Sequence, residues 1–204
     1  MLRRTLMIAA TFAGLAPAAQ AYAAASGNEF WTKLLGRLDR QGESFACFSQ
    51  RYDDAHLSAH PRQRVAFAKA LVDGFFQESV AGPASGSYMY QVTLAFRFRD
   101  RAETLTGVVE CGDGTPKDSL RHGAHCAGPG DAHTHLALSG RQAVIMTISR
   151  GADLWMPGPQ DQRHDTVKNP FGPDDRVFRL VRTDLKQCED LAFDRQKPLR
   201  PHEP

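Results

Sequence analysis

The chain has 204 residues, 42% of them hydrophobic and 24% charged, with a formal net charge of +2 when its histidines are neutral. This balance is typical of a globular protein and leaves no basic excess to bind nucleic acid or to anchor on anionic lipid. The length suits a single domain with its own hydrophobic core, which we expect to be a monomer.

The first 23 residues have the pattern of a cleaved signal peptide. A basic head, Arg3-Arg4, precedes an apolar run from Leu6 to Leu15. Both Ala19–Ala21 and Ala21–Ala23 place small residues at the −3 and −1 positions of a signal-peptidase site. The run is shorter than the roughly 20 residues of a transmembrane helix. The pattern predicts a periplasmic or secreted protein with no membrane span, and it leaves general secretory and twin-arginine export both open.

Residues 28–40 have the apolar spacing of a helix. One face, at i, i+3, i+4 and i+7, carries Trp31, Leu34, Leu35 and Leu38. Asn28 is positioned to cap this helix and Gly42 to end it. Residues 44–52 then alternate in the manner of a short strand.

Residues 61–77 fit two structures. A helical stripe follows a proline that suits a first helical turn, and it consists of Val65, Ala68, Leu71, Val72, Phe75 and Phe76. The same segment also fits a strand, which only Lys69 interrupts. The local pattern favours the helix.

From residue 88 onward the pattern indicates antiparallel β structure. Apolar and polar residues alternate over 88–98, a charged turn follows at 99–103, and 105–111 suits the partner strand. A second hairpin is predicted from 133–138 and 142–149, and a last strand from 176–182. We therefore expect a mainly β domain over residues 28–195, followed by a flexible tail over 196–204. Its fold would be an antiparallel barrel or sandwich with a short N-terminal helix.

The four cysteines of an exported chain indicate two disulfides. Three pairings are possible. We favour Cys111–Cys126, which closes a loop of about 16 residues, together with Cys47–Cys188, which ties the two ends of the domain. On a chain-entropy model the short loop stabilises the fold by about 3 kcal/mol and the long loop by about 5 kcal/mol.

Two segments stand out together, Cys47–Pro61 and Gly172–Cys188. They resemble a group of exported bacterial proteins of unknown function. The resemblance covers most of residues 45–190 and implies a secreted β-rich domain in which residues 65–71 form a strand. It implies no activity, so it assigns no catalytic residue.

The best candidate for a functional site is a group of histidines. His133 and His135 are two residues apart, so on a strand both would point to the same side. With His122 and His125 from the preceding loop, they would supply imidazole nitrogens to Zn²⁺ or Cu²⁺. The alternative is a polar, solvated loop. If the expected disulfides form, the Cys126 sulfur is not a ligand.

Other polar groups fit structural roles better. Asp53 and Asp54 suit acceptors of turn N–H bonds, before a rigid corner at His60-Pro61, although His56 and His60 would share one helical face. Asp174-Asp175 suits a turn better than a calcium loop, which needs more oxygen ligands. A solvated outer face is favoured over an anion-binding stripe for Arg97, Arg99, Arg101, Arg179 and Arg182.

The sequence shows no catalytic nucleophile paired with a base, no zinc-protease motif and no phosphate-binding glycine loop. We therefore expect a non-enzymatic binding or interaction module without a resident cofactor. Its ligand would be a small molecule held in a barrel mouth or a protein of the cell envelope. The alternatives are a Zn²⁺- or Cu²⁺-binding protein that uses the four histidines, and a hydrolase whose site one sequence does not reveal.

Overall fold

The computed structural model describes residues 25–38, 40–80, 82–112, 123–128, 132–148, 153–156, 166–193 and 199. Its elements are, in chain order, α1 (Ala25–Leu35), β1 (Glu43–Arg51), α2 (Asp54–Ala59), β2 (Val65–Ser79), β3 (Gly82–Phe98), β4 (Thr104–Cys111), β5 (Gly123–Gly128), β6 (Ala132–Leu138), β7 (Ala143–Ile148), β8 (Leu154–Trp155), β9 (Thr166–Val167), β10 (Val177–Thr183) and the 3₁₀ helix η2 (Leu185–Leu191). The predicted signal peptide lies outside this part of the chain, as does the predicted tail apart from Leu199. None of the helices within these ranges is both long and apolar enough to cross a membrane.

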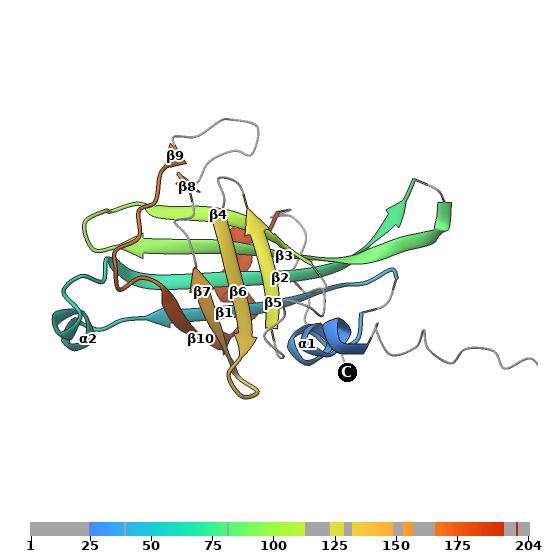
Figure 1. Cartoon of the computed structure of the whole chain (residues 1–204), viewed down its shortest axis with the longest axis horizontal. Coiled ribbons are helices and arrows are strands. Elements are labelled where there is room, and N and C mark those ends of the chain that lie inside the picture. The colour runs from blue at the N-terminus through green and yellow to red at the C-terminus, as the bar shows by residue number, and fades with distance from the viewer. Residues whose placement is uncertain are drawn as a thin grey trace, which may run out of the picture.

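Eight strands form a closed antiparallel barrel (Figure 1). Strands β1 to β7 pair in chain order, and β10 closes the ring by pairing with both β7 and β1. The short β8–β9 hairpin is inserted between β7 and β10 and lies against β4, where Trp155 pairs with Thr106. Of the two β architectures expected from the sequence, the barrel is therefore the one that forms.

The alternation predicted for residues 88–98 is confirmed in β3. Tyr90, Val92, Leu94, Phe96 and Phe98 are buried in the core, and the residues between them face outward. An eight-stranded barrel is just wide enough for its interior to be filled by side chains. Successive residues of each strand therefore alternate between this core and the outer surface.

The segment over residues 61–77 forms a strand, so the helix that its local pattern favours is wrong. β2 pairs with both β1 and β3. Two features hide its alternation: the register shifts between Val65 and Phe67, and Leu71 on the outer face is buried beneath η2. A strand with apolar residues on both faces resembles a helical stripe over a short window, because neither shows a clean period of two.

Helix α1 closes one end of the barrel. The Trp31 ring stacks on Tyr90 with the two centroids 4.1 Å apart, and both side chains are buried. Gly74 of β2 leaves room for the helix, since a Cβ there would lie 2.6 Å from the Leu35 side chain. The amphipathic face predicted for this helix therefore points into the barrel.

The ends of α1 differ from the prediction. The helix ends at Leu35 and not near Gly42, because Gly36 adopts φ 83° and donates its N–H to the Thr32 carbonyl at 2.9 Å. Asn28 lies within the helix and does not cap it.

Both predicted disulfides form. Cys111 of β4 lies directly opposite Cys126 of β5, so this bond joins neighbouring strands of the barrel wall. Cys47 of β1 is bonded to Cys188 of η2, 141 residues further along the chain. The second bond fastens the end of the domain to its first strand, as the spacing predicts.

The opposite end of the barrel is closed by residues 169–175, which we call the strap. Its Phe171 is buried, with its ring centroid 5.0 Å from that of Phe96 and 5.7 Å from that of Phe98. The strap and α1 therefore cover the two ends, and side chains pack the space between them.

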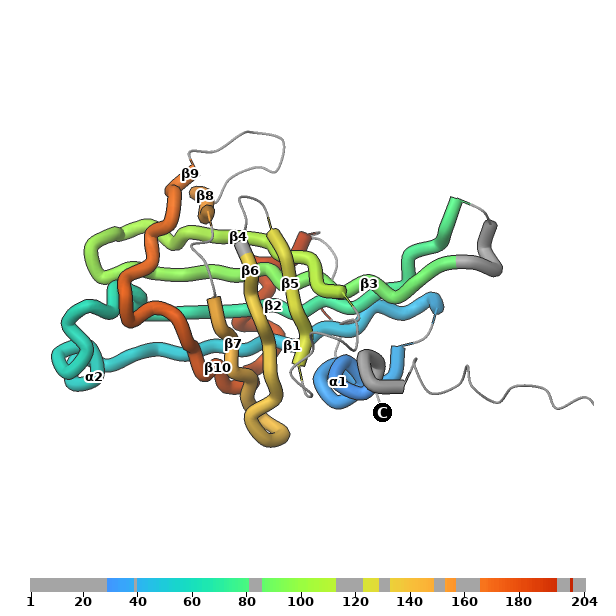
Figure 2. Tube along the Cα trace, in the orientation of Figure 1, coloured from blue at the N-terminus to red at the C-terminus, as the bar shows by residue number. Residues whose placement is uncertain are grey.

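Strands β2 and β3 extend beyond the barrel. Residues 76–79 and 82–89 pair as a two-stranded ribbon. Its residues 76–79 and 86–89 project to the right in Figure 2. The pairing of β1 with β2 ends at Phe75, and the pairing of β4 with β3 begins at Tyr90. The ribbon therefore lies outside the closed ring.

Candidate functional site

Three of the four predicted histidines lie on the outer face of the sheet formed by β5 and β6. His125 of β5 is opposite His135 of β6, and His133 is opposite Ala127. Thr134, between the two histidines of β6, is buried on the inner face. His133 and His135 therefore share a face, as their spacing predicts, and the pairing of β5 with β6 adds His125 to it. His122 lies outside the described residues.

His125 and His133 point ring nitrogens at each other. Nε2 of His125 lies 3.2 Å from Nδ1 of His133, and the ring centroids are 5.2 Å apart. Two nitrogens that bind one Zn²⁺ at about 2.0–2.1 Å with a tetrahedral angle are about 3.3–3.4 Å apart. Cis nitrogens around a square-planar Cu²⁺ are about 2.9 Å apart. The pair can therefore share a hydrogen bond without a metal, or chelate an ion after a small turn of the rings.

His135 is the more enclosed ring of the three. Its Nε2 is buried and has no hydrogen-bond partner within the described ranges. The ring lies against Gly123, where a Cβ would be 2.6 Å from this nitrogen. Burial lowers the pKa of His135, and the neighbouring His125 lowers it further. The neutral form of the imidazole, which is the form that binds metals, is therefore favoured.

The complete four-histidine cluster expected from the sequence does not assemble in the part of the chain that the structure describes. There, no three His, Cys, Asp or Glu side chains converge closely enough to hold a metal ion together. Cys126 is bonded to Cys111 and buried, so its sulfur is not a ligand. The candidate site is the pair His125 and His133, with His135 beside it.

A second histidine pair, on α2, is bound by the protein's own groups. Asp53 caps the helix by accepting the His56 backbone N–H at 2.8 Å, which confirms its predicted role. The His56 ring stacks on Tyr52 with the centroids 4.6 Å apart, and its centroid is 4.5 Å from that of His60. Its Nε2 is 2.9 Å from Oε1 of the buried Gln63. This cluster is structural.

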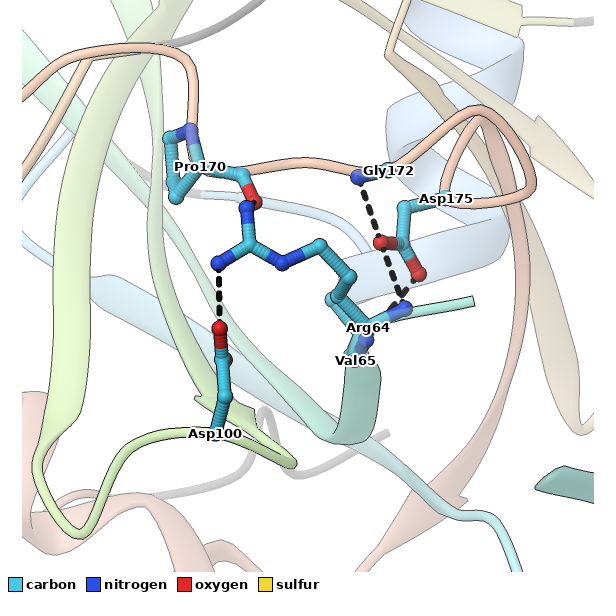
Figure 3. Close-up of polar contacts among 6 residues, drawn as sticks. All are labelled: Arg64, Val65, Asp100, Pro170, Gly172 and Asp175. Carbon is cyan, nitrogen blue, oxygen red and sulfur yellow. Dashed lines mark hydrogen bonds and ion pairs between the residues drawn. The ribbon is translucent and has the colours of Figure 1, made fainter. Parts of the chain in front are cut away.

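The most saturated polar group is Asp175, whose role sequence analysis missed (Figure 3). It is fully buried, and its carboxylate accepts backbone N–H groups from Gly172 at 2.7 Å, Arg64 at 2.9 Å and Val65 at 3.1 Å. The predicted turn is also present, since the Asp175 N–H donates to the Gly172 carbonyl. The local sequence gives no signal for the rest, because Arg64 and Val65 are more than a hundred residues away.

Arg64 strengthens the same closure. Its guanidinium donates to the Pro170 carbonyl at 2.7 Å and to the Asp100 carboxylate at 2.6 Å. Burial raises the pKa of Tyr52, and the Asp175 carboxylate raises it further, so the phenol stays neutral. The strap is therefore held by charge-assisted bonds on both of its sides.

The two segments that carry the family resemblance meet in space. Cys47–Pro61 contains the second half of β1, which pairs with β10 in Gly172–Cys188, and the two segments share the Cys47–Cys188 bond. The strap at the start of the second segment binds Arg64, just after the first. Through these contacts, both segments help to close the barrel.

The arginines considered for an outer stripe are dispersed. Arg182 points into the barrel end, where its guanidinium donates to the Leu34 carbonyl and lies 5.0 Å from the Phe48 ring centroid. Burial lowers the pKa of Arg182. Its charge meets the C-terminal carbonyls of α1, a stabilising position for a cation. Arg99 donates to the Leu57 carbonyl of α2 at 3.4 Å.

The chain matches no protein-family model, and no match to a curated protein or to a solved structure was found. The resemblance to exported proteins of unknown function therefore stays a prediction.

Proposed function

We propose that this chain is an exported, non-enzymatic binding module that binds a Zn²⁺ or Cu²⁺ ion on the outer face of β5 and β6. The 3.2 Å separation between Nε2 of His125 and Nδ1 of His133 carries the proposal. Two imidazoles at this distance, fixed on paired strands, need little rearrangement to share one ion. Imidazole suits both metals, and solvent would fill the other coordination positions.

The way the barrel is closed favours a ligand on the outside. Trp31 of α1 and Phe171 of the strap are buried at opposite ends of the barrel, and the core between them is packed with side chains. A small molecule in the barrel mouth would have to displace one of these aromatic rings. The histidine pair, by contrast, lies on the outer surface and needs no opening of the fold.

The covalent framework agrees with export. The two disulfides are compatible with an oxidising compartment such as the periplasm or the extracellular space, where structural disulfides persist. The Cys111–Cys126 bond joins β5 to β4 on the inner side of the strand that carries His125. It therefore holds that strand while a ligand binds on the outer side.

The test is metal binding to protein that has first been stripped with a chelator. Titration with Zn²⁺ and with Cu²⁺, followed by isothermal calorimetry, is expected to give one ion per chain for at least one metal. The double variant His125→Ala/His133→Ala should lose this binding. The matched control is His56→Ala/His60→Ala, which removes two histidines from α2 and should retain it. Equal binding by both double variants would refute the proposed site.

A further inference from the structure

Within the part of the chain that the structure describes, the ribbon of residues 76–79 and 82–89 has two edges that pair with no further strand. Its strands pair with each other from Phe76 opposite Tyr88 to Ser79 opposite Gly82. Within the described ranges, neither β1 nor β4 continues alongside it. Figure 2 shows the ribbon extending away from the barrel. Among the described residues, the backbone N–H and C=O groups along each edge therefore have no neighbouring strand, and such groups can pair with another chain.

The two edges differ in charge. Residues 82–89, on the β3 edge, include no Asp, Glu, Lys or Arg, whereas the β2 edge carries Glu78. Natural proteins guard exposed edge strands with charged side chains or proline. The β3 edge has Pro83 alone, near the tip. It is therefore the edge that is less protected against pairing.

The ribbon also presents apolar side chains to solvent. Phe75 and Met89 form a cross-strand pair at its base and are only partly buried, and Val80 at the tip is fully exposed. One face of the base is fastened: the Tyr88 hydroxyl donates to the Leu38 carbonyl at 3.2 Å, and Arg40 lies over the Phe76 ring. Two strands alone are at best marginally stable in water, so additional strands would stabilise this segment.

We propose that the β3 edge, residues 82–89, pairs antiparallel with the same edge of a second copy of this chain. Antiparallel pairing of one edge with itself is a two-fold contact, in which the same patch serves both copies. The neutral edge meets its copy without charge repulsion. Pairing through the β2 edge would instead bring the two Glu78 side chains together. The result is a dimer joined by a four-stranded ribbon, where the sequence alone led us to expect a monomer.

Sedimentation velocity or light scattering over a concentration series tests the dimer. The wild-type protein should shift from monomer to dimer as its concentration rises. Ser87→Lys places a charge on the β3 edge, where it lies against the strand of the second copy, and should weaken the dimer by about tenfold or more. Gln77→Lys is the matched control, since Gln77 is also exposed and is paired with Ser87, but lies on the other strand. It should change the dimer by about twofold or less.

Amide hydrogen exchange supplies a second readout that needs no variant. Amides in residues 82–89 should exchange more slowly at high than at low protein concentration, while those in 76–79 should change much less. A wild-type protein that stays monomeric at every concentration would overturn the proposal. So would a dimer that the two lysine variants weaken equally, because the interface would then lie elsewhere.

Discussion

The outer face of β5 and β6 and the strap end of the barrel differ in how fully their polar groups are hydrogen-bonded within the protein. At the strap, the Asp175 carboxylate and the Gln63 amide each reach partners inside the protein. On the sheet face, the rings of His125 and His133 contact each other, and Nε2 of His135 is buried without a hydrogen-bond partner among the described residues. Saturated polar groups stabilise a fold, whereas unsaturated ones with metal-binding nitrogens can take up a ligand.

The same contrast separates the two histidine pairs. His56 lies on α2 and His60 follows its last residue as the C-cap, and His56 already bonds to Gln63. His125 and His133 come from neighbouring strands, and their nitrogens have the separation of two ligands of one ion. The ability of a histidine cluster to bind a metal therefore depends on the separation of its ring nitrogens and not on how many histidines lie close together.

The largest effect on stability is expected at the strap end of the barrel, where Asp175 is fully hydrogen-bonded. Asp175→Asn replaces a buried acceptor of three N–H bonds with an amide that presents its own donors to them. We expect the free energy of unfolding to fall by about 3 kcal/mol, measured by urea denaturation. The neighbouring Asp174→Asn is the control. It breaks an exposed ion pair with Arg62 and should cost less than about 1 kcal/mol. Equal costs would mean that the strap is not fastened by Asp175.

Metal binding to His125 and His133 on the outer face of β5 and β6 should stabilise the folded protein. At a free Zn²⁺ or Cu²⁺ concentration of about 100 times its dissociation constant, a ligand that binds only the folded state stabilises it by about 2.7 kcal/mol. Thermal unfolding with and without metal measures this gain. Asp175→Asn should keep the gain although it starts from a lower stability, whereas His125→Ala/His133→Ala should lose it. A gain that survives in the histidine variant would place the metal elsewhere.

Gln63→Leu probes the hydrogen bonds that occupy His56. The change removes the bond to His56 Nε2 and the 2.9 Å bond that the Gln63 amide donates to the Val65 carbonyl. We expect a loss of about 1–2 kcal/mol in unfolding free energy, with metal affinity unchanged. In contrast, Gln50→Leu removes an exposed bond to the Arg51 carbonyl and should have little effect. A rise in metal affinity after Gln63→Leu would show that the α2 histidines also bind metal once they are released.

The smallest effect is a pH dependence at His135. The folded-state pKa of His135 lies below the ordinary value for histidine, first because of burial and then because of His125. As the pH falls below the ordinary pKa of histidine, about 6.5, the unfolded chain takes up a proton at this residue. The folded protein does not take it up until the pH reaches its lower pKa, so the free energy of unfolding decreases between the two values. Denaturation of metal-free protein at neutral and at mildly acidic pH should therefore show a small loss, which His135→Gln reduces. An unchanged pH dependence in that variant would assign the loss to other groups.

Local pattern predicted the parts of the fold whose two faces have different environments. The β3 alternation from Tyr90 to Phe98 was predicted correctly because one face is apolar and meets the core, while the other carries the partly exposed Gln91, Thr93 and Arg97, although Ala95 on that face is buried beneath η2. The β2 segment was misassigned because η2, which begins more than a hundred residues later, buries Leu71 on the outer face. The end of α1 was misplaced because Gly36 and not Gly42 adopts the left-handed conformation.

For the candidate site, the spacing of His133 and His135 placed them on one face, but it did not indicate which ring would meet His125. That contact depends on the register of β5 against β6, which opposes His125 to His135 yet lets its ring reach His133. The role of Asp175 was likewise hidden, since its partners Arg64 and Val65 are distant in the sequence.

The sequence by itself determined a β-rich chain with an N-terminal amphipathic helix and an even number of cysteines that indicates two disulfides, because side-chain periodicity and cysteine number are local or countable properties; the pairing that it favoured is the one that the structure contains. Only the tertiary structure decided that the strands close into a barrel, that its ends are covered by Trp31 and Phe171, and that two histidine rings meet on its outer surface. These outcomes depend on strand register and on contacts between distant segments, and such contacts leave no periodic trace in the chain.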